Sequence, residues 1–274
     1  MKPYMIHTFP WYDGSAGEKV LHMLAKALWE RFPNDTFVLA DKQGKLNIPT
    51  VSQCSAPRVD CIGIYPEVTH GNPLECGTIV RYLLNVPGVF GGPASYLPTD
   101  VLFIYHQFFN NKVGLPENRI LTTPYVDTKV FYNMGLERAG RLYYQGHGRV
   151  YGSLNVPNIG NGWKHNGEEG QKALAVTLNK CELLYSFDSI TAMYEIARLC
   201  GCPVIIMPNA QWSKEECKAI QTWDAGGIGY GLEDEAYVLA TIDSEKMKAS
   251  VEAGERVFQG QLDNFIQITQ EAAG

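Results

Sequence analysis

Three polar residues in the second half of the chain stand at helical spacing. Asp188, Thr191 and Glu195 follow an i, i+3, i+7 pattern, so they share one face if this segment is helical. Residues 182–186 are predicted as a buried strand, and the helix start that follows would offer free backbone N–H groups to a phosphate. Glu195 would lie about 10 Å further along the axis, where a carboxylate can accept both hydroxyls of a ribose. These residues are candidate nucleotide contacts.

The same predicted helix has recognisable ends. Asp188 or Ser189 can cap its start, and Gly201 can end it. Its apolar stripe consists of Ile190, Met193, Tyr194 and Ala197. Ser189 therefore joins the candidate phosphate contacts. The alternative interpretation is a solvated helix face with a local Glu195–Arg198 ion pair.

A second candidate site is the loop between the first predicted strand and the first predicted helix. It contains Asp13, Gly14 and Gly17, and glycines allow a backbone to approach a ligand closely. Asp13 is a candidate general base toward an acceptor hydroxyl. The spacing lacks the G-x-G-x-x-G pattern of dinucleotide-binding loops. An ordinary strand-to-helix turn is the alternative. Glu67, after a later strand, either lines the site or supports the neighbouring helix from outside.

Two further loops carry cations or an aromatic residue. Gly146 and His147 belong to a Q-G-H-G-R segment after a predicted strand, and His147 or Arg149 can neutralise a diphosphate leaving group. Trp163 and Lys164 share a later loop, where Trp163 can stack on a nucleobase and Lys164 can meet phosphate. A surface turn and a structural tryptophan are the alternative interpretations.

Composition limits the function classes. The net charge of −6 gives no general basis for binding nucleic acid or an anionic membrane. The six histidines and seven cysteines lack metal-site spacing, so we expect no metal. The irregular cysteines favour reduced thiols, and the N-terminus lacks an apolar signal core. No apolar run approaches the roughly 20 residues of a membrane span, so we expect a cytoplasmic protein.

The order of elements predicts an α/β fold. Strands and helices alternate on both sides of a polar segment at 108–119, which predicts two Rossmann-like, doubly wound domains, residues 1–112 and 113–274, facing a cleft. A helix is expected over 71–85, because Asn72 can cap it and Pro73 suits its first position. The tail from Ser244 to Ala273 is predicted to be one helix that can cross back onto the first domain.

Several segments resemble GT-B glycosyltransferases. The block "YSFDSITAMYEIARLCGCPVIIMP" is similar to the family's donor-site block, with Glu195-Ile196 at a Glu-Ala-like pair and Gly201-Cys202-Pro203-Val204 opening the next strand. The run "DAGGIGYGLEDEAYVLATI" resembles the family's Gly-rich segment and acidic helix start. The run "GRLYYQGHGR" resembles its strand followed by Gly-x-Gly. The resemblance extends over residues 119–243 and is weaker in the N-terminal half.

The resemblance implies a metal-independent glycosyltransferase with no cofactor beyond its co-substrate. A nucleotide-diphosphate sugar would bind mainly to the C-terminal domain, and a glycan or small hydroxyl acceptor would approach from the side of Gly14. Similarity to transferases of polysaccharide assembly implies a possible peripheral membrane or assembly partner. The alternatives are a nucleotide-sugar epimerase on the same fold and a catalytically silent GT-B-like binding module.

Overall fold

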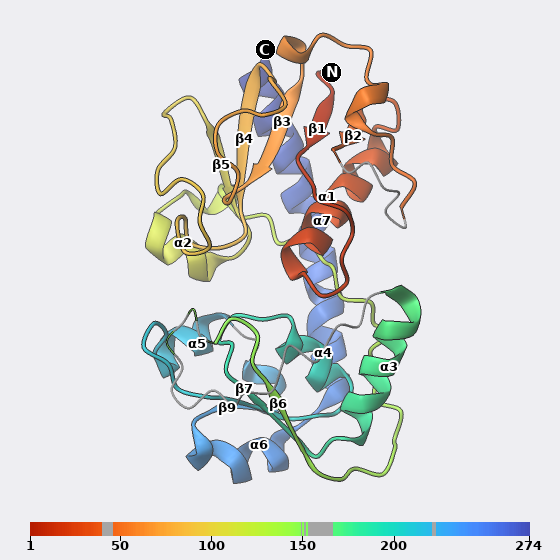
Figure 1. Cartoon of the computed structure of the whole chain (residues 1–274), viewed down its shortest axis with the longest axis vertical. Helices are drawn as coiled ribbons and strands as arrows, with labels where there is room; N and C mark the ends of the chain where they lie inside the picture. The colour runs from red at the N-terminus through yellow and green to blue at the C-terminus, as the bar shows by residue number, and fades with distance from the viewer. Residues whose placement is uncertain (40–45, 149, 151, 153–166, 221–222) are drawn as a thin grey trace. The chain divides into compact units, whose positions relative to one another are not determined.

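The computed structural model describes residues 1–39, 46–148, 150, 152, 167–220 and 223–274 (Figure 1). They form two compact units: Met1–Tyr125 together with Gly254–Gly274, and Val126–Ala253. This division differs from the predicted boundary at 112/113. The segment after residue 112 stays with the first unit as far as Tyr125, and the end of the chain returns to that unit.

The first unit contains a five-stranded parallel sheet in the order β2-β1-β3-β4-β5. Its strands are β1 (Tyr4–Ile6), β2 (Thr36–Val38), β3 (Ile62–Pro66), β4 (Thr78–Leu83) and β5 (Val101–Ile104). The chain runs from β1 to β2 on one side and later places β3 on the other side of β1. The order of strands therefore reverses between β1 and β3, which is where open α/β sheets form ligand crevices.

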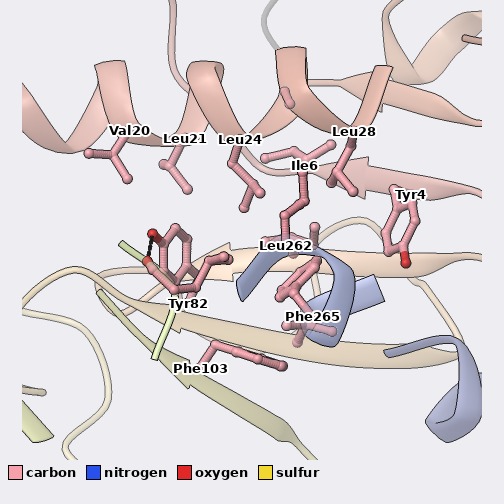
Figure 2. Close-up of a cluster of buried hydrophobic side chains, with 14 of the residues drawn as sticks. Tyr4, Ile6, Val20, Leu21, Leu24, Leu28, Tyr82, Phe103, Leu262 and Phe265 are labelled. Carbon is pink, nitrogen blue, oxygen red and sulfur yellow. Dashed lines mark hydrogen bonds between the residues drawn. The ribbon is translucent and has the colours of Figure 1, made fainter. Parts of the chain in front are cut away.

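Helices α1 (Ala16–Arg31) and α7 (Ser244–Ala273) bury one face of this sheet. Side chains of α1 point toward the sheet in Figure 2, and Leu262 and Phe265 of α7 join the same cluster. Alternation along β1 sends Tyr4 and Ile6 into this cluster and Met5 into a second cluster on the other face. That second face is covered by the 3-10 helix η1 (Val51–Gln53) and by loops.

The helix predicted over residues 71–85 is wrong, because Thr78–Leu83 is strand β4. The Asn72 side chain does not cap a helix. It closes a turn by accepting from Cys76 N at 3.1 Å and donating to Cys76 O at 2.8 Å. Glu75 has a positive φ of 57°, which also breaks a helix. Asn72, which resembles a helix cap in the sequence, therefore forms this turn. The β-branched residues that follow it pair with β3.

The second unit contains a four-stranded parallel sheet in the order β6-β7-β8-β9. Its strands are β6 (Arg141–Tyr144), β7 (Leu183–Ser186), β8 (Val204–Ile206) and β9 (Ile228–Tyr230). Its helices are α3 (Gly167–Lys180), α4 (Met193–Leu199), α5 (Lys214–Ile220) and α6 (Glu235–Thr241). Figure 1 shows α6 on one side of this sheet and α4 on the other. Val238 of α6 packs with inward-facing residues of β7 and β8.

The remaining elements are short. Helix α2 (Gln107–Val113) lies where a linker was expected, and its end is set by Gly114 in the left-handed conformation. The other 3-10 helices are η2 (Arg58–Asp60), η3 (Glu117–Arg119), η4 (Trp223–Ala225) and η5 (Leu232–Asp234). Within the described ranges, no helix has the length and apolar character needed to cross a membrane.

Candidate functional site

The carboxyl edge of the second sheet holds most of the residues singled out from the sequence. The prediction that a helix begins at Asp188 is wrong, since α4 begins at Met193 and residues 187–192 form a loop. Asp188, Thr191 and Glu195 therefore do not share one helical face. The Thr191 hydroxyl accepts from Met193 N at 3.2 Å, so it closes a local turn directly before the helix.

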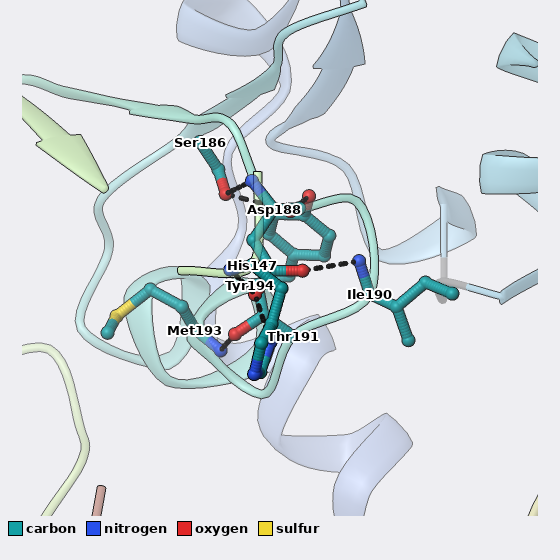
Figure 3. Close-up of polar contacts among 7 residues, drawn as sticks. All are labelled: His147, Ser186, Asp188, Ile190, Thr191, Met193 and Tyr194. Atoms are coloured by element: carbon teal, nitrogen blue, oxygen red, sulfur yellow. Dashed lines mark hydrogen bonds and ion pairs between the residues drawn. The ribbon is translucent and has the colours of Figure 1, made fainter. Parts of the chain in front are cut away.

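Asp188 is 1% exposed, and its carboxylate holds two loops together (Figure 3). One oxygen, Oδ2, accepts from the backbone N–H of His147 at 2.9 Å and lies 3.1 Å from His147 Nδ1. The other oxygen, Oδ1, accepts from Ile190 N at 3.1 Å. The loop after β6 is thereby tied to the loop after β7.

Gly146 is required for this approach. It has a positive φ of 46°, and a Cβ atom at this position would lie 2.3 Å from Asp188 Oδ2. Only a residue without a side chain lets the β6 loop close over the carboxylate. Gly146 thus makes room for the Asp188 side chain.

The backbone of Asp188 is also fixed from within the unit. Ser186 Oγ donates to Asp188 O at 2.9 Å, and the hydroxyl of the fully buried Tyr194 donates to the same oxygen. Ser189 is fully buried, and its hydroxyl accepts from the side-chain amide of Asn209, which follows β8. The side chains of Asp188 and Ser189 are therefore engaged inside the protein, and their place in a nucleotide site stays a prediction.

His147 is the residue of this cluster that faces solvent. Its side chain is 57% exposed, whereas that of Asp188 is 1% exposed. The hydrogen bond and the negative charge of Asp188 raise the pKa of the His147 imidazole, against the lowering effect of burial. A buried carboxylate that orients an exposed imidazole produces a partly charged group suited to an anion or to proton transfer.

Glu195 lies in the first turn of α4 and is partly exposed. Its charge raises the pKa of the buried Arg198, although burial lowers that pKa more strongly, to about 10. The Arg198 guanidinium donates to Tyr194 O at 3.1 Å and to Gly226 O at 3.2 Å. Glu195 therefore has an electrostatic role within the helix.

The loop between β1 and α1 in the first unit contains Asp13, Gly14 and Gly17. Asp13 is buried, and its carboxylate accepts from the indole N–H of Trp11 at 2.9 Å. A Cβ at Gly14 would lie 2.5 Å from the Tyr12 ring, so this glycine lets the loop fold back on its own aromatic residue. Gly17 lies within the first turn of α1, with ordinary clearance.

Polar residues that follow β1 and β3 lie at the reversal of strand order in the first sheet. The hydroxyl of Thr69 lies 3.3 Å from His7 Nδ1, and Glu67 accepts from Leu84 N at 3.0 Å. Burial raises the pKa of Glu67 to about 7. Thr8 has a buried hydroxyl with no hydrogen-bond partner in the part of the chain that the structure describes. This edge can bind a polar group or exchange a proton near neutral pH.

Sequence reasoning missed His7 and Thr69 as members of one cluster, and it missed Tyr194 and Asn209 as supports of the second edge. The available signal was a polar residue directly after a short apolar strand, as in Met5-Ile6-His7. Trp163 and Lys164, together with Arg149, lie outside the described residues. Among the described residues, no group of three or more His, Cys, Asp or Glu side chains could hold a metal ion.

The described residues thus define two α/β units. Each unit has a parallel sheet with polar side chains at its carboxyl edge. No protein-family model and no curated protein matches the chain. The crystal structure of a functionally uncharacterized protein from Klebsiella pneumoniae subsp. pneumoniae NTUH-K2044 is similar, with a TM-score of 0.40 and 9% sequence identity. The similarity covers 79% of this chain and 87% of that one. Similarity at this level assigns neither a family nor a function to the chain.

Proposed function

We propose that the protein is a glycosyltransferase that moves a sugar from a nucleotide-diphosphate sugar to a hydroxyl acceptor. The observation that carries the proposal is the His147–Asp188 pair at the carboxyl edge of the second sheet, where parallel α/β sheets bind their ligands. An imidazole with a raised pKa is a cation over part of the neutral range. It suits the charge that develops on a departing diphosphate.

In this proposal His147 contacts the diphosphate, and Asp188 orients the imidazole and raises its pKa. Glu195 accepts the ribose hydroxyls, while Trp163 and Lys164 stay sequence-based predictions for the nucleobase and phosphate. The bond between the anomeric carbon and the diphosphate oxygen breaks, and the electron pair leaves with the diphosphate. The acceptor oxygen bonds to the anomeric carbon and gives its proton to a general base, for which Asp13 stays a sequence-based prediction.

A silent binding module is the second candidate. Its support is that Asp188 and Ser189, both expected to contact phosphate, form hydrogen bonds within the protein instead. Such a module would bind a nucleotide or glycan without turnover.

Calorimetry and thermal shift with UDP, GDP, dTDP and CMP, followed by their sugars, separate the possibilities. A transferase binds one nucleotide specifically, gains stability that rises with the logarithm of the ligand concentration above the dissociation constant, and releases the nucleotide when acceptors are added. Specific binding without release in any acceptor pool supports the module. A flat response across the panel contradicts the transferase and favours the silent module.

His147→Gln tests the assigned group, because glutamine keeps a hydrogen-bond donor and removes the titratable charge. Affinity for the diphosphate should fall about 5- to 30-fold, as expected for a charge-assisted hydrogen bond. Wild-type affinity should weaken as the pH rises through the pKa of His147, and the variant should lose that dependence. His70→Gln, an exposed histidine in the first unit, is the matched control.

A further inference from the structure

A cavity of about 450 Å³ lies in the second unit at the amino ends of its strands. Arg141 is the first residue of β6, Leu183 is the first residue of β7, and Pro203 directly precedes β8; all three line the cavity. The His147–Asp188 pair follows the carboxyl ends of β6 and β7. The cavity is therefore at the opposite edge of the same sheet, and its function does not depend on the proposed transferase activity. Its volume lies in the range of small-molecule sites.

Arg138 brings a positive charge to this cavity. Its guanidinium donates to three backbone carbonyl oxygens, of Leu178 at 3.1 Å, Cys181 at 2.9 Å and Cys200 at 2.5 Å, and to Asn133 Oδ1 at 3.4 Å. No carboxylate of the described residues forms an ion pair with it. A Cβ at Gly201 would lie 2.6 Å from a guanidinium nitrogen of Arg138, so the glycine leaves the space that the guanidinium occupies. The carbonyls fix the position of the charge but do not supply an anionic partner.

Glu182 brings the opposite charge. Glu182 is exposed and lines the cavity, and its carboxylate has no ion-pair partner in the described parts of the chain. The second arginine in the lining, Arg141, is already paired with Glu235 and donates to the Tyr185 hydroxyl at 2.8 Å. The uncompensated charges of the cavity are thus one guanidinium and one carboxylate, too far apart to form an ion pair with each other.

The rest of the lining supplies neutral polar and apolar contacts. Asn133 Nδ2 donates to Ser244 Oγ at 3.3 Å, which places a hydroxyl and an amide on one wall. Leu239 and Ile242 give an apolar wall. A complementary ligand therefore carries both charges and an apolar portion.

We propose that this cavity binds a small zwitterion of the amino-acid type. Its carboxylate meets Arg138, its ammonium group meets Glu182, and an apolar side chain lies against Leu239 and Ile242. A single anion would lack a partner for Glu182, and a single cation would be repelled by Arg138. Charge complementarity therefore selects against both.

Calorimetry on the full chain with three probes that share an isobutyl group tests the charge requirement. L-Leucine carries both charges, 4-methylpentanoate only the carboxylate, and isopentylamine only the ammonium group. We expect leucine to bind at least about tenfold more tightly than either analogue, as for the loss of one charge-assisted contact. Equal affinity for leucine and 4-methylpentanoate, or no binding of leucine at millimolar concentration, overturns the proposal.

Variants locate the site without disturbing Arg138, which anchors three carbonyls. Glu182→Gln should weaken leucine binding about tenfold, and the exposed Glu137→Gln should leave it unchanged. Leu239→Trp fills the cavity and should abolish binding, whereas Leu232→Trp, at a comparably exposed leucine outside the lining, should not. Thermal melts verify that each variant is folded. Equal losses in Glu182→Gln and Glu137→Gln, or retained binding in folded Leu239→Trp, contradict the assignment.

Discussion

The Nδ1 atom of His147 lies 3.1 Å from Oδ2 of Asp188, and the two residues come from loops that follow neighbouring parallel strands. The carboxylate is buried and the imidazole is half exposed. Because the carboxylate also accepts from two backbone N–H groups, it stays fixed while the imidazole meets solvent. The contact with Asp188 therefore gives His147 an oriented imidazole that is partly charged.

Asp188→Asn should lower the pKa of His147, because the variant removes the negative charge that favours the imidazolium form. Titration of the His147 ring protons by NMR, assigned with His147→Gln, measures the change. Asp127→Asn, at an exposed aspartate of the same unit, serves as the control. An unchanged His147 pKa in folded Asp188→Asn would mean that the carboxylate does not set the charge of the ring.

Glu195→Gln should reduce the affinity for the nucleotide by about 1–3 kcal/mol, or roughly 5- to 150-fold, if the carboxylate accepts ribose hydroxyls. The sharper test uses the 2′-deoxynucleotide as a second partner in a double-mutant cycle. The variant should discriminate less between ribose and deoxyribose than the wild-type protein does. Glu215→Gln on α5 is the matched control. Additive losses in the cycle would remove Glu195 from the ribose contact.

Glu67→Gln should change the dependence of stability on pH. The raised pKa of Glu67 means that the folded state retains a proton that the unfolded state has lost between about pH 4.5 and 7. Stability contributed by this group is fully present below its unfolded pKa and is lost as pH rises toward 7. The variant should therefore be more stable than the wild type at pH 8, by up to about 3 kcal/mol.

Urea unfolding from pH 4 to pH 8 checks this prediction. The difference between wild type and Glu67→Gln should grow with pH and level off above pH 7. Glu117→Gln, at an exposed glutamate of the same unit, should give a small difference with no such rise. A pH-independent difference for Glu67→Gln would show that folding does not raise the pKa of this carboxyl group.

Phe265→Ala should destabilise the protein by about 3–5 kcal/mol, because the side chain is fully buried in the core of the first unit. Its ring centroid lies 4.7 Å from that of Phe103 on β5, so the substitution removes a contact between the helix and the sheet. Val257→Ala on the same helix replaces an exposed residue and should change stability by less than about 0.5 kcal/mol. Equal effects of the two substitutions in chemical unfolding would contradict the packing of α7 on this sheet.

Segments with a long, regular apolar period were predicted well. Ser244–Ala273 is one helix with the predicted bounds, and Phe258, Leu262 and Phe265 are buried as its period requires. Short segments with local cap signals were predicted poorly. Asn72 and Asp188 both have side chains that can cap a helix. Asn72 instead closes a turn, and Asp188 binds a distant loop, since the same hydrogen-bonding groups can serve either purpose.

The candidate site shows the same contrast. The sequence places Gly146, His147 and Asp188 at the ends of predicted strands, but it does not indicate which of these residues are in contact in the folded protein. The pairing of β6 with β7 brings the two loops together, and burial of the Asp188 carboxylate decides that it supports His147 instead of facing a ligand. His7 and Thr69 meet for the same reason, through the pairing of β1 with β3.

Taken alone, the sequence determined that this is an α/β protein with parallel sheets and a long C-terminal helix, because apolar periodicity is a local property that neighbouring residues share. Only the tertiary structure decided which unit that helix joins, where α4 begins, and which polar side chains stay available to a ligand. Those outcomes depend on contacts between residues far apart in the chain, and hydrogen bonds and burial at such contacts outweigh local preference.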